Sequence, residues 1–98
     1  MQTKHYFVYI TTNKSNSVLY TGITNDIIKR SYQHRMLSGS QFAAKYHVTK
    51  LVYYEVFTEV NEAIKREKQI KAGSRKKKLD LIKKINPEFR DLWDDIVG

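Results

Sequence analysis

Short runs of aromatic and β-branched residues near the start of the chain predict a β-hairpin. The runs span residues 6–10 and 18–21, and the polar residues between them are typical of a turn. Folding the hairpin symmetrically about this loop places Tyr9 opposite Tyr20, with Gly22 on the same face as Tyr20. The missing side chain at Gly22 would leave room for a ligand to approach the backbone. The plainer interpretation is a hairpin whose tyrosines pack on its core face.

The next segment predicts a helix over residues 26–37, ending near residues 38–40. Thr24 or Asn25 is the expected N-cap, and Asp26 suits the positive end of the helix dipole. Ile28 and Tyr32, helped by Ile27, mark the apolar stripe that we expect to be buried.

Arg30 and His34 lie four residues apart on another face of this predicted helix. Such a pair usually faces solvent. Because the helix begins directly after the hairpin, however, we expect Arg30 to lean toward Tyr9 and Tyr20.

Residues 51–57 predict a third strand, and residues 61–72 predict a second helix. Both faces of the strand carry apolar residues, which is typical of a central strand covered on both sides. The helix should bury the stripe Val60, Ala63, Ile64 and Ile70.

Glu67 falls within the apolar stripe of the second helix. A carboxylate on an apolar face costs several kcal/mol unless it is paired or binds a cation. Two interpretations follow: an ion pair with a nearby Lys or Arg, or a ligand for a divalent metal.

The C-terminal third predicts two more helices. The first spans residues 75–85 and opens with the basic run Arg75, Lys76, Lys77 and Lys78, which is unfavourable for the helix dipole. We expect these four side chains to contact phosphate, or at minimum to keep the protein soluble. Asn86 and Pro87 should end this helix, and Pro87 suits the first turn of a last helix over residues 88–96.

The composition narrows the class of partner. The 98 residues are enough for one domain with one modest core, and 41% of them are hydrophobic, which indicates a globular protein. The net charge of +8 favours an anionic partner, nucleic acid before an acidic membrane surface. No apolar run approaches the length of a membrane span, and the start of the chain has no signal-peptide pattern. The absence of cysteine excludes disulfides and thiolate metal sites, and we expect a cytoplasmic protein.

Several of these residues together resemble the GIY-YIG nuclease domain. The resemblance rests on Phe7-Val8-Tyr9, on Tyr20-Thr21-Gly22 eleven residues later, and then on Arg30, His34 and Glu67. It covers nearly the whole chain and is closest to the small stand-alone bacterial members, which are similar to the nuclease module of nucleotide-excision repair. It implies an α+β fold in the order β-β-α-β-α-α, with a small three-stranded antiparallel sheet flanked by helices. It also implies one Mg²⁺ or Mn²⁺ and hydrolysis of a DNA phosphodiester.

The resemblance also implies roles for single residues. Tyr9 and Tyr20 match the two motif tyrosines, Arg30 the helix arginine, His34 the residue one turn later, Glu67 the metal ligand, and Asn86 a late polar residue. Some members carry a lysine directly after the second motif that lowers a tyrosine pKa, but Ile23 stands there in this chain. The identity of the general base is therefore left open between Tyr9, Tyr20 and His34.

The chemistry of these residue types supports the same hypothesis. Tyr9 or Tyr20 would position or deprotonate the attacking water, with His34 as proton relay or alternative base. Arg30 would bind the scissile phosphate, Asn86 would hydrogen-bond a metal-bound water or the phosphate, and Gly22 would approach the substrate.

The alternative is a nucleic-acid-binding module that kept the fold and the basic surface without the catalytic activity. A membrane-surface protein is disfavoured because core residues interrupt the cationic helices. We expect a monomer that acts on DNA, including branched or damaged DNA, in repair or processing.

Overall fold

The computed structural model describes residues 4–36 and 45–97. Its elements follow the predicted order and confirm an α+β fold with a three-stranded antiparallel sheet: β1 (Tyr6–Thr12), β2 (Leu19–Thr24), α1 (Ile27–Arg35), β3 (Lys50–Phe57), α3 (Val60–Ala72), α4 (Arg75–Ile85) and α5 (Trp93–Val97). The predicted end of the first helix, at residues 38–40, lies outside the described residues. No helix in the described ranges is both long enough and apolar enough to cross a membrane.

The strand order is β2-β1-β3, so the prediction that residues 51–57 form the central strand is wrong. The central strand is β1, and β3 lies at an edge. Leu51, Val52 and Tyr53 are nevertheless buried in succession. Helices cover both faces of the sheet, so an edge strand here shows the continuous apolar pattern that is typical of a central strand.

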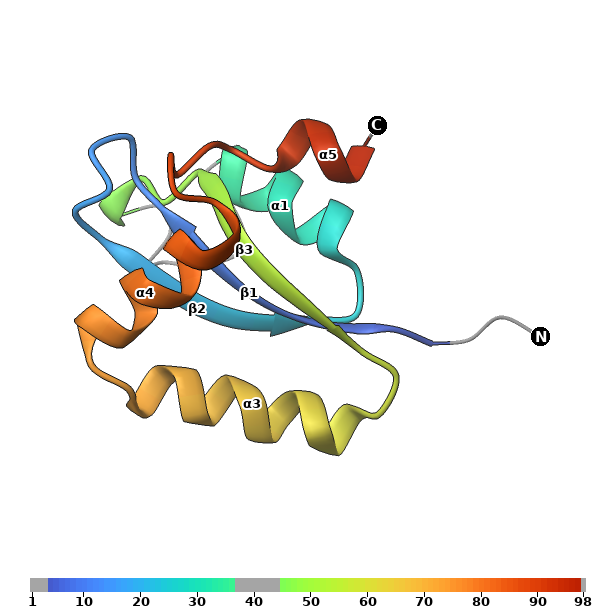
Figure 1. The fold of residues 1–98 in the computed structure, drawn as a ribbon. Coiled ribbons are helices and arrows are strands. Elements are labelled where there is room, and N and C mark those ends of the chain that lie inside the picture. Colours follow the sequence, from blue (N-terminus) through green and yellow to red (C-terminus); the bar gives the residue numbers. More distant parts are fainter. Residues whose placement is uncertain (1–3, 37–44, 98) are drawn as a thin grey trace.

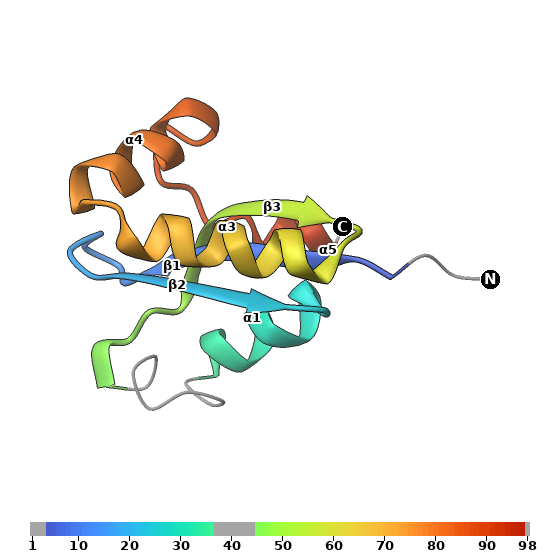
Figure 2. The ribbon, with the colours of Figure 1, turned by 90° about the horizontal axis from the view of Figure 1, so that it is seen from below.

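The two faces of the sheet have different cores. Figure 1 shows the sheet between α3 on one side and α1 with α5 on the other, and Figure 2 shows α3 running along the strands. Val8 and Ile10 point toward α3 and α4, where Ala63, Ile70 and Ile82 pack against them. The opposite face carries a second buried cluster, which is made of Tyr9, Ile27, Leu51 and Leu92.

The hairpin pairs in a register different from the one predicted. Tyr9 lies opposite Gly22, and Tyr20 lies opposite Thr11. The loop spans residues 13–18, and the Asn13 carboxamide oxygen holds it by accepting hydrogen bonds from the backbone N–H groups of residues 17 and 18, at 2.8 and 3.1 Å. A shift of two residues keeps each side chain on its face, so Tyr9 and Tyr20 remain neighbours.

Helix α1 buries a different stripe from the one predicted. Asp26 is its N-cap and accepts a hydrogen bond from the Lys29 N–H at 3.0 Å. The expected core residues Ile28 and Tyr32 are 47% and 56% exposed, so that prediction is wrong. Ile27 is buried as expected, and Ser31 and His34 are buried with it. The buried stripe contains two polar side chains, and a pattern of apolar positions does not detect it.

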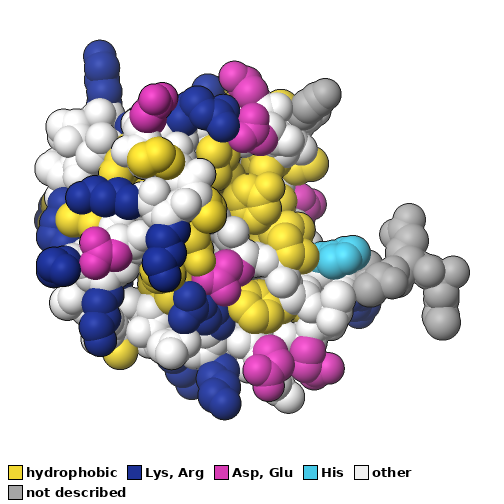
Figure 3. Space-filling model, in the orientation of Figure 1, with side chains coloured by type: hydrophobic (Ala, Val, Ile, Leu, Met, Phe, Trp, Pro, Cys, Tyr) yellow, Lys and Arg dark blue, Asp and Glu magenta, His cyan; other side chains and the backbone are white. Residues whose placement is uncertain are grey.

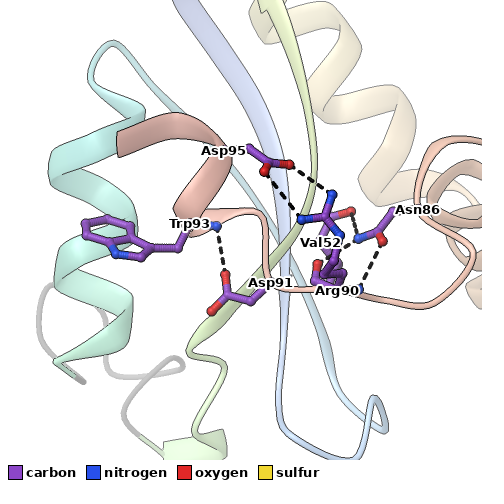
Figure 4. A network of polar contacts seen from close by, with 6 residues as sticks. All are labelled: Val52, Asn86, Arg90, Asp91, Trp93 and Asp95. Carbon is purple, nitrogen blue, oxygen red and sulfur yellow. Dashed lines mark hydrogen bonds and ion pairs between the residues drawn. The ribbon is translucent and has the colours of Figure 1, made fainter. Parts of the chain in front are cut away.

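The segment after α4 also differs from the prediction. Residues 88–92 do not form a helix, and α5 begins only at Trp93. Phe89 has a φ of 54°, which turns the chain away from a helical path. Figure 4 shows the Asn86 amide holding this turn: its Nδ2 donates to the carbonyls of Val52 and Arg90, at 3.1 and 2.8 Å, and its Oδ1 accepts from the Arg90 N–H at 3.0 Å.

Asp91 fixes the C-terminal segment against both β3 and α1. Its carboxylate pairs with Arg35 of α1 and accepts hydrogen bonds from the N–H groups of Leu51 and Trp93, at 3.3 and 3.1 Å. The Leu92 N–H donates to the Leu51 carbonyl at 2.7 Å. Arg35 also lies over the Trp93 ring, 5.1 Å from its centre. These contacts close the Tyr9 side of the core.

Candidate active site

Tyr9 and His34 form a buried hydrogen-bonded pair. The Tyr9 oxygen lies 3.2 Å from His34 Nε2, and both side chains are 1% exposed. His34 Nδ1 lies 3.3 Å from the Val48 carbonyl oxygen. A carbonyl oxygen only accepts, so Nδ1 carries the proton of the neutral ring. Nε2 is then the acceptor, and the Tyr9 hydroxyl donates to it.

The surroundings keep both members of this pair uncharged. Burial is the main cause that raises the pKa of Tyr9 above 10, with Tyr20 and Glu67 adding to the effect and the Arg30 guanidinium opposing it. Burial is also the main cause that lowers the pKa of His34 below 6.5. The Val48 hydrogen bond opposes this, and Arg30 adds to it. At neutral pH the pair is a phenol and a neutral imidazole.

Tyr20 connects the buried pair to the surface. Its ring centre lies 6.3 Å from that of Tyr9 and 5.4 Å from that of His34, while the Tyr9 and His34 centres are 5.6 Å apart. Tyr20 is half-buried, and a side-chain hydrogen bond with Tyr20 contributes to the raised pKa of Tyr9. Arg30 is also half-buried, and its charge acts on both Tyr9 and His34. The four predicted residues of the hairpin and α1 therefore lie together.

Gly22 serves the site in a different way from the one predicted. A Cβ atom at Gly22 would lie 2.3 Å from the Tyr9 oxygen and 2.5 Å from the adjacent ring carbon. The space above Gly22 therefore holds the Tyr9 phenol, and the expected approach of a ligand to the backbone at this point does not occur. Glycine is needed here so that the Tyr9 ring can lie across β2 toward His34.

Glu67 approaches this group from α3. Its charge is among the causes that raise the pKa of Tyr9, so it lies within electrostatic reach of that phenol. Its side chain is only 12% exposed and pairs with Lys71 Nζ at 2.6 Å, which matches the ion-pair interpretation of the sequence. Within residues 4–36 and 45–97, no group of three or more His, Cys, Asp or Glu side chains is arranged to hold a metal.

Asn86 and the basic run are not part of this cluster. The three hydrogen bonds of Asn86 go to backbone groups and hold the turn after α4. Arg75 donates to the Asn16 carbonyl in the hairpin loop, at 3.2 Å, and Lys76 pairs with Asp80 at 3.5 Å. Lys77 and Lys78 line a hollow between α3 and α4. The buried residue of α4, Ile82, packs on the face of the sheet opposite Tyr9.

Two contributors to the site are not among the predicted residues. The Val48 carbonyl sets the His34 tautomer, but it is a backbone group and has no residue-type signature. Lys71 is the partner of Glu67, and its i, i+4 spacing was the available clue.

Comparisons with known proteins agree on one family. The family model described as the GIY-YIG catalytic domain matches residues 5–80. A UPF0213 protein of Staphylococcus saprophyticus is 46% identical over 79 residues, which cover 81% of this chain and 94% of that protein. A UPF0213 protein of Staphylococcus haemolyticus is 42% identical over the same shares.

A solved structure gives the same result for the fold. The solution NMR structure of a UPF0213 protein from Bacillus halodurans is 29% identical to this chain, with a TM-score of 0.57. The match covers 89% of this chain and 92% of that one. With the tyrosines, Arg30, His34 and Glu67 gathered as described, this chain belongs to the GIY-YIG catalytic domain family and is similar to its small stand-alone UPF0213 members.

Proposed function

We propose that this protein is a divalent-metal-dependent nuclease that hydrolyses DNA phosphodiester bonds, in DNA repair or processing. The observation that carries the proposal is the Tyr9–His34 hydrogen bond, with Tyr20 beside it and the Arg30 charge within reach. Membership of a catalytic-domain family that acts as a nuclease, and a net charge of +8, support the reaction class and an anionic substrate.

The site must first accept a proton from the attacking water. An isolated phenol is a poor base at neutral pH, and burial makes Tyr9 a poorer one. The hydrogen bond to His34 removes this difficulty, because Tyr9 passes its own proton to Nε2 as it accepts another. Tyr20 is the more exposed phenol, so it contacts the water and hands the proton inward to Tyr9. His34 is thus the final proton acceptor of a relay.

The site must also stabilise the negative charge on the phosphate. Arg30 is the cation nearest the pair, and its planar guanidinium suits two hydrogen bonds to phosphate oxygens. In its resting position it also lowers the pKa of Tyr9, which favours proton transfer. Arg30 therefore binds the scissile phosphate and assists the relay.

The residues present fit a single magnesium ion. Mg²⁺ is commonly bound through one or two carboxylates together with water and substrate phosphates. Glu67 provides one carboxylate, and its partner Lys71 is 54% exposed and free to swing away. Glu67 would hold the ion, which neutralises charge on the departing 3′-oxygen when it is bound.

A metal-dependence assay tests the proposal. Labelled single-stranded, double-stranded and branched DNA would be incubated with Mg²⁺ or Mn²⁺, and with EDTA. We expect cleavage of at least one DNA with metal, none with EDTA, and none by Glu67→Gln. Lys68→Gln, an exposed change one residue away, should cleave as the wild type does.

The second candidate is a nucleic-acid-binding module without catalytic activity. Its support is the Glu67–Lys71 ion pair, which satisfies the carboxylate without any metal. This candidate predicts equal DNA binding with Mg²⁺ and with EDTA, unchanged binding by Glu67→Gln, and no cleavage at high protein concentration.

A further inference from the structure

The junction of α3 and α4 forms a hollow that the Tyr9 cluster does not use. Its volume is about 330 Å³. Its lining includes the buried Ile70, the half-buried Leu81 and four cationic side chains: Arg66, Lys77, Lys78 and Lys84. Figure 3 shows Lys and Arg side chains gathered over α4 and the C-terminal half of α3, with hydrophobic atoms between them.

The charge at this hollow is not balanced. Glu55 neutralises Arg66, with Nε–O distances of 3.1 and 3.0 Å, and Asp80, which also lines the hollow, pairs with Lys76. Lys78 donates to the carbonyl oxygen of residue 71 at 3.3 Å, which leaves its charge in place. Within the described ranges, Lys77 and Lys84 form no ion pair. The surplus of positive charge faces a concave surface, where an anion is attracted most strongly.

The helix dipole of α4 disfavours the cations at its start but favours Lys84, which lies in its last turn. Lys76, Lys77 and Lys78 occupy its first turn, where the dipole disfavours cations. Lys77, Leu81 and Lys84 are spaced i, i+4, i+7, so they form one stripe that faces the hollow. Lys77 and Lys84 therefore present their charges to the hollow together.

The hollow is separate from the catalytic cluster. Glu67 is not among the residues that line it, although its neighbours Arg66 and Ile70 on α3 are. The buried residue of α4 packs on the Val8 and Ile10 face of the sheet, whereas Tyr9 and His34 belong to the opposite face. A ligand in the hollow does not touch the reacting atoms.

We propose that the hollow is a second binding site for the phosphate backbone of nucleic acid, away from the scissile phosphate. Lys77 and Lys84 are about 10 Å apart along the helix, at 1.5 Å per residue. That span exceeds one phosphate group, which favours a polymer over a free ion. Lysine contacts to the phosphate backbone do not read the base sequence, so the site raises affinity without sequence preference. The choice of nucleic acid rests on the proposed function.

The test is binding of a short labelled DNA duplex in EDTA, where no cleavage occurs, measured between about 50 and 200 mM salt. The variant is Lys77→Ala/Lys84→Ala. The control is Lys68→Ala/Lys83→Ala, which removes the same charge from exposed positions on α3 and α4 that do not line the hollow. We expect the first variant to bind about tenfold more weakly at the higher salt concentration. Its log–log salt slope should fall by about 1.8, for two lost phosphate contacts.

NMR gives an independent readout on the wild type. Duplex DNA should shift the backbone amide signals of Gly73 and Lys77, which line the hollow. Equal binding and equal slope for the two double variants would overturn the proposal. So would shifts at Gly73 and Lys77 that inorganic phosphate produces but duplex DNA does not.

The outcome also separates this proposal from the proposed function. If no DNA is cleaved but binding depends on Lys77 and Lys84, the nuclease proposal fails and the second site stands. If cleavage occurs and the double variant binds and cleaves as its control does, the second site fails and the nuclease proposal stands.

Discussion

The two faces of the sheet are built from different chemistry. On the α3 and α4 face, the side chains of Val8 and Ile10 meet an aliphatic core, and α3 also carries the largely buried Glu67. On the α1 and α5 face, β1 contributes Tyr9 and α1 contributes the buried His34, and the two side chains are hydrogen-bonded. One face is held by hydrophobic burial and the other by directed hydrogen bonds as well.

This difference separates chemistry from binding. A buried phenol and imidazole are costly unless each is hydrogen-bonded, so the network fixes their orientation and protonation state. Lysines at the surface cost little and attract any polyanion. The comparison predicts that changes on the Tyr9 face alter the rate of cleavage, and that changes at the α3–α4 hollow alter affinity.

The largest expected effect is on the rate. Arg30→Ala should lower single-turnover cleavage at least about 100-fold, because it removes the cation that binds the scissile phosphate. Lys29→Ala removes the same charge from an exposed position on the same helix and should have little effect. Equal rates for the two variants would contradict the role given to Arg30.

Asn86→Ala should reduce stability by about 3 kcal/mol, because three hydrogen bonds are lost and buried backbone groups are left unpaired. Chemical denaturation measures this loss. Arg90→Ala, which breaks an exposed ion pair, should cost less than about 1 kcal/mol. Cleavage per folded molecule should be unchanged in Asn86→Ala. Normal stability with lost cleavage would instead assign Asn86 to the catalytic site, as the resemblance implies.

Gly22→Ala should reduce stability by about 2 kcal/mol and displace Tyr9, since the added Cβ meets the phenol at 2.3 Å. Gly73→Ala is the matched control. Its nearest neighbour would be a carbonyl oxygen at 3.3 Å, so we expect a small change or a slight gain. Thermal unfolding of both variants measures the difference, and equal melting temperatures would contradict the close approach at Gly22.

The smallest effect is a pH dependence. The pKa of His34 is lowered below 6.5 in the folded state, so below pH 6.5 the unfolded chain binds the extra proton more readily. Stability should therefore fall as the pH drops below 6.5, by up to about 1.4 kcal/mol per pH unit from this residue. His34→Gln should flatten that slope in denaturation experiments. An unchanged slope would show that a group other than His34 causes the pH dependence.

At alkaline pH, we expect stability to fall as the pH rises. The pKa of Tyr9 is raised above 10, and burial with the neighbouring Glu55 raises the pKa of Tyr53 to about 12. The folded state then holds protons that the unfolded chain releases. Stability from both tyrosines is complete below pH 10 and is lost as the pH rises above it.

The aliphatic face was the easier one to predict from sequence. The bounds of α3 and α4 follow from apolar periodicity, and the structure agrees to within a residue. Strand order and hairpin register were predicted wrongly. A two-sided apolar pattern does not distinguish an edge strand covered by helices, and Asn13 holds the hairpin loop by side-chain hydrogen bonds that symmetry does not predict.

On the Tyr9 face, the hairpin pattern predicted that Tyr9 and Tyr20 are neighbours, but the apolar pattern did not predict the buried His34. Burial of His34 and exposure of Tyr32 contradict the apolar pattern of α1, because the inward stripe includes Ser31 and an imidazole. The Val48 carbonyl that fixes the imidazole leaves no mark in the residue types. Functional sites commonly break local patterns in this way.

The most direct test measures affinity and rate on both faces with one DNA substrate. Tyr9→Phe keeps the ring and removes the hydroxyl that donates to His34, so single-turnover cleavage at saturating DNA should fall by about 100-fold or more with unchanged affinity. Lys77→Ala/Lys84→Ala should bind about tenfold more weakly and cleave at the wild-type rate once saturated. If Tyr9→Phe cleaves as fast as the wild type, the relay from Tyr20 through Tyr9 to His34 is wrong, and with it the assignment of the chemistry to this face.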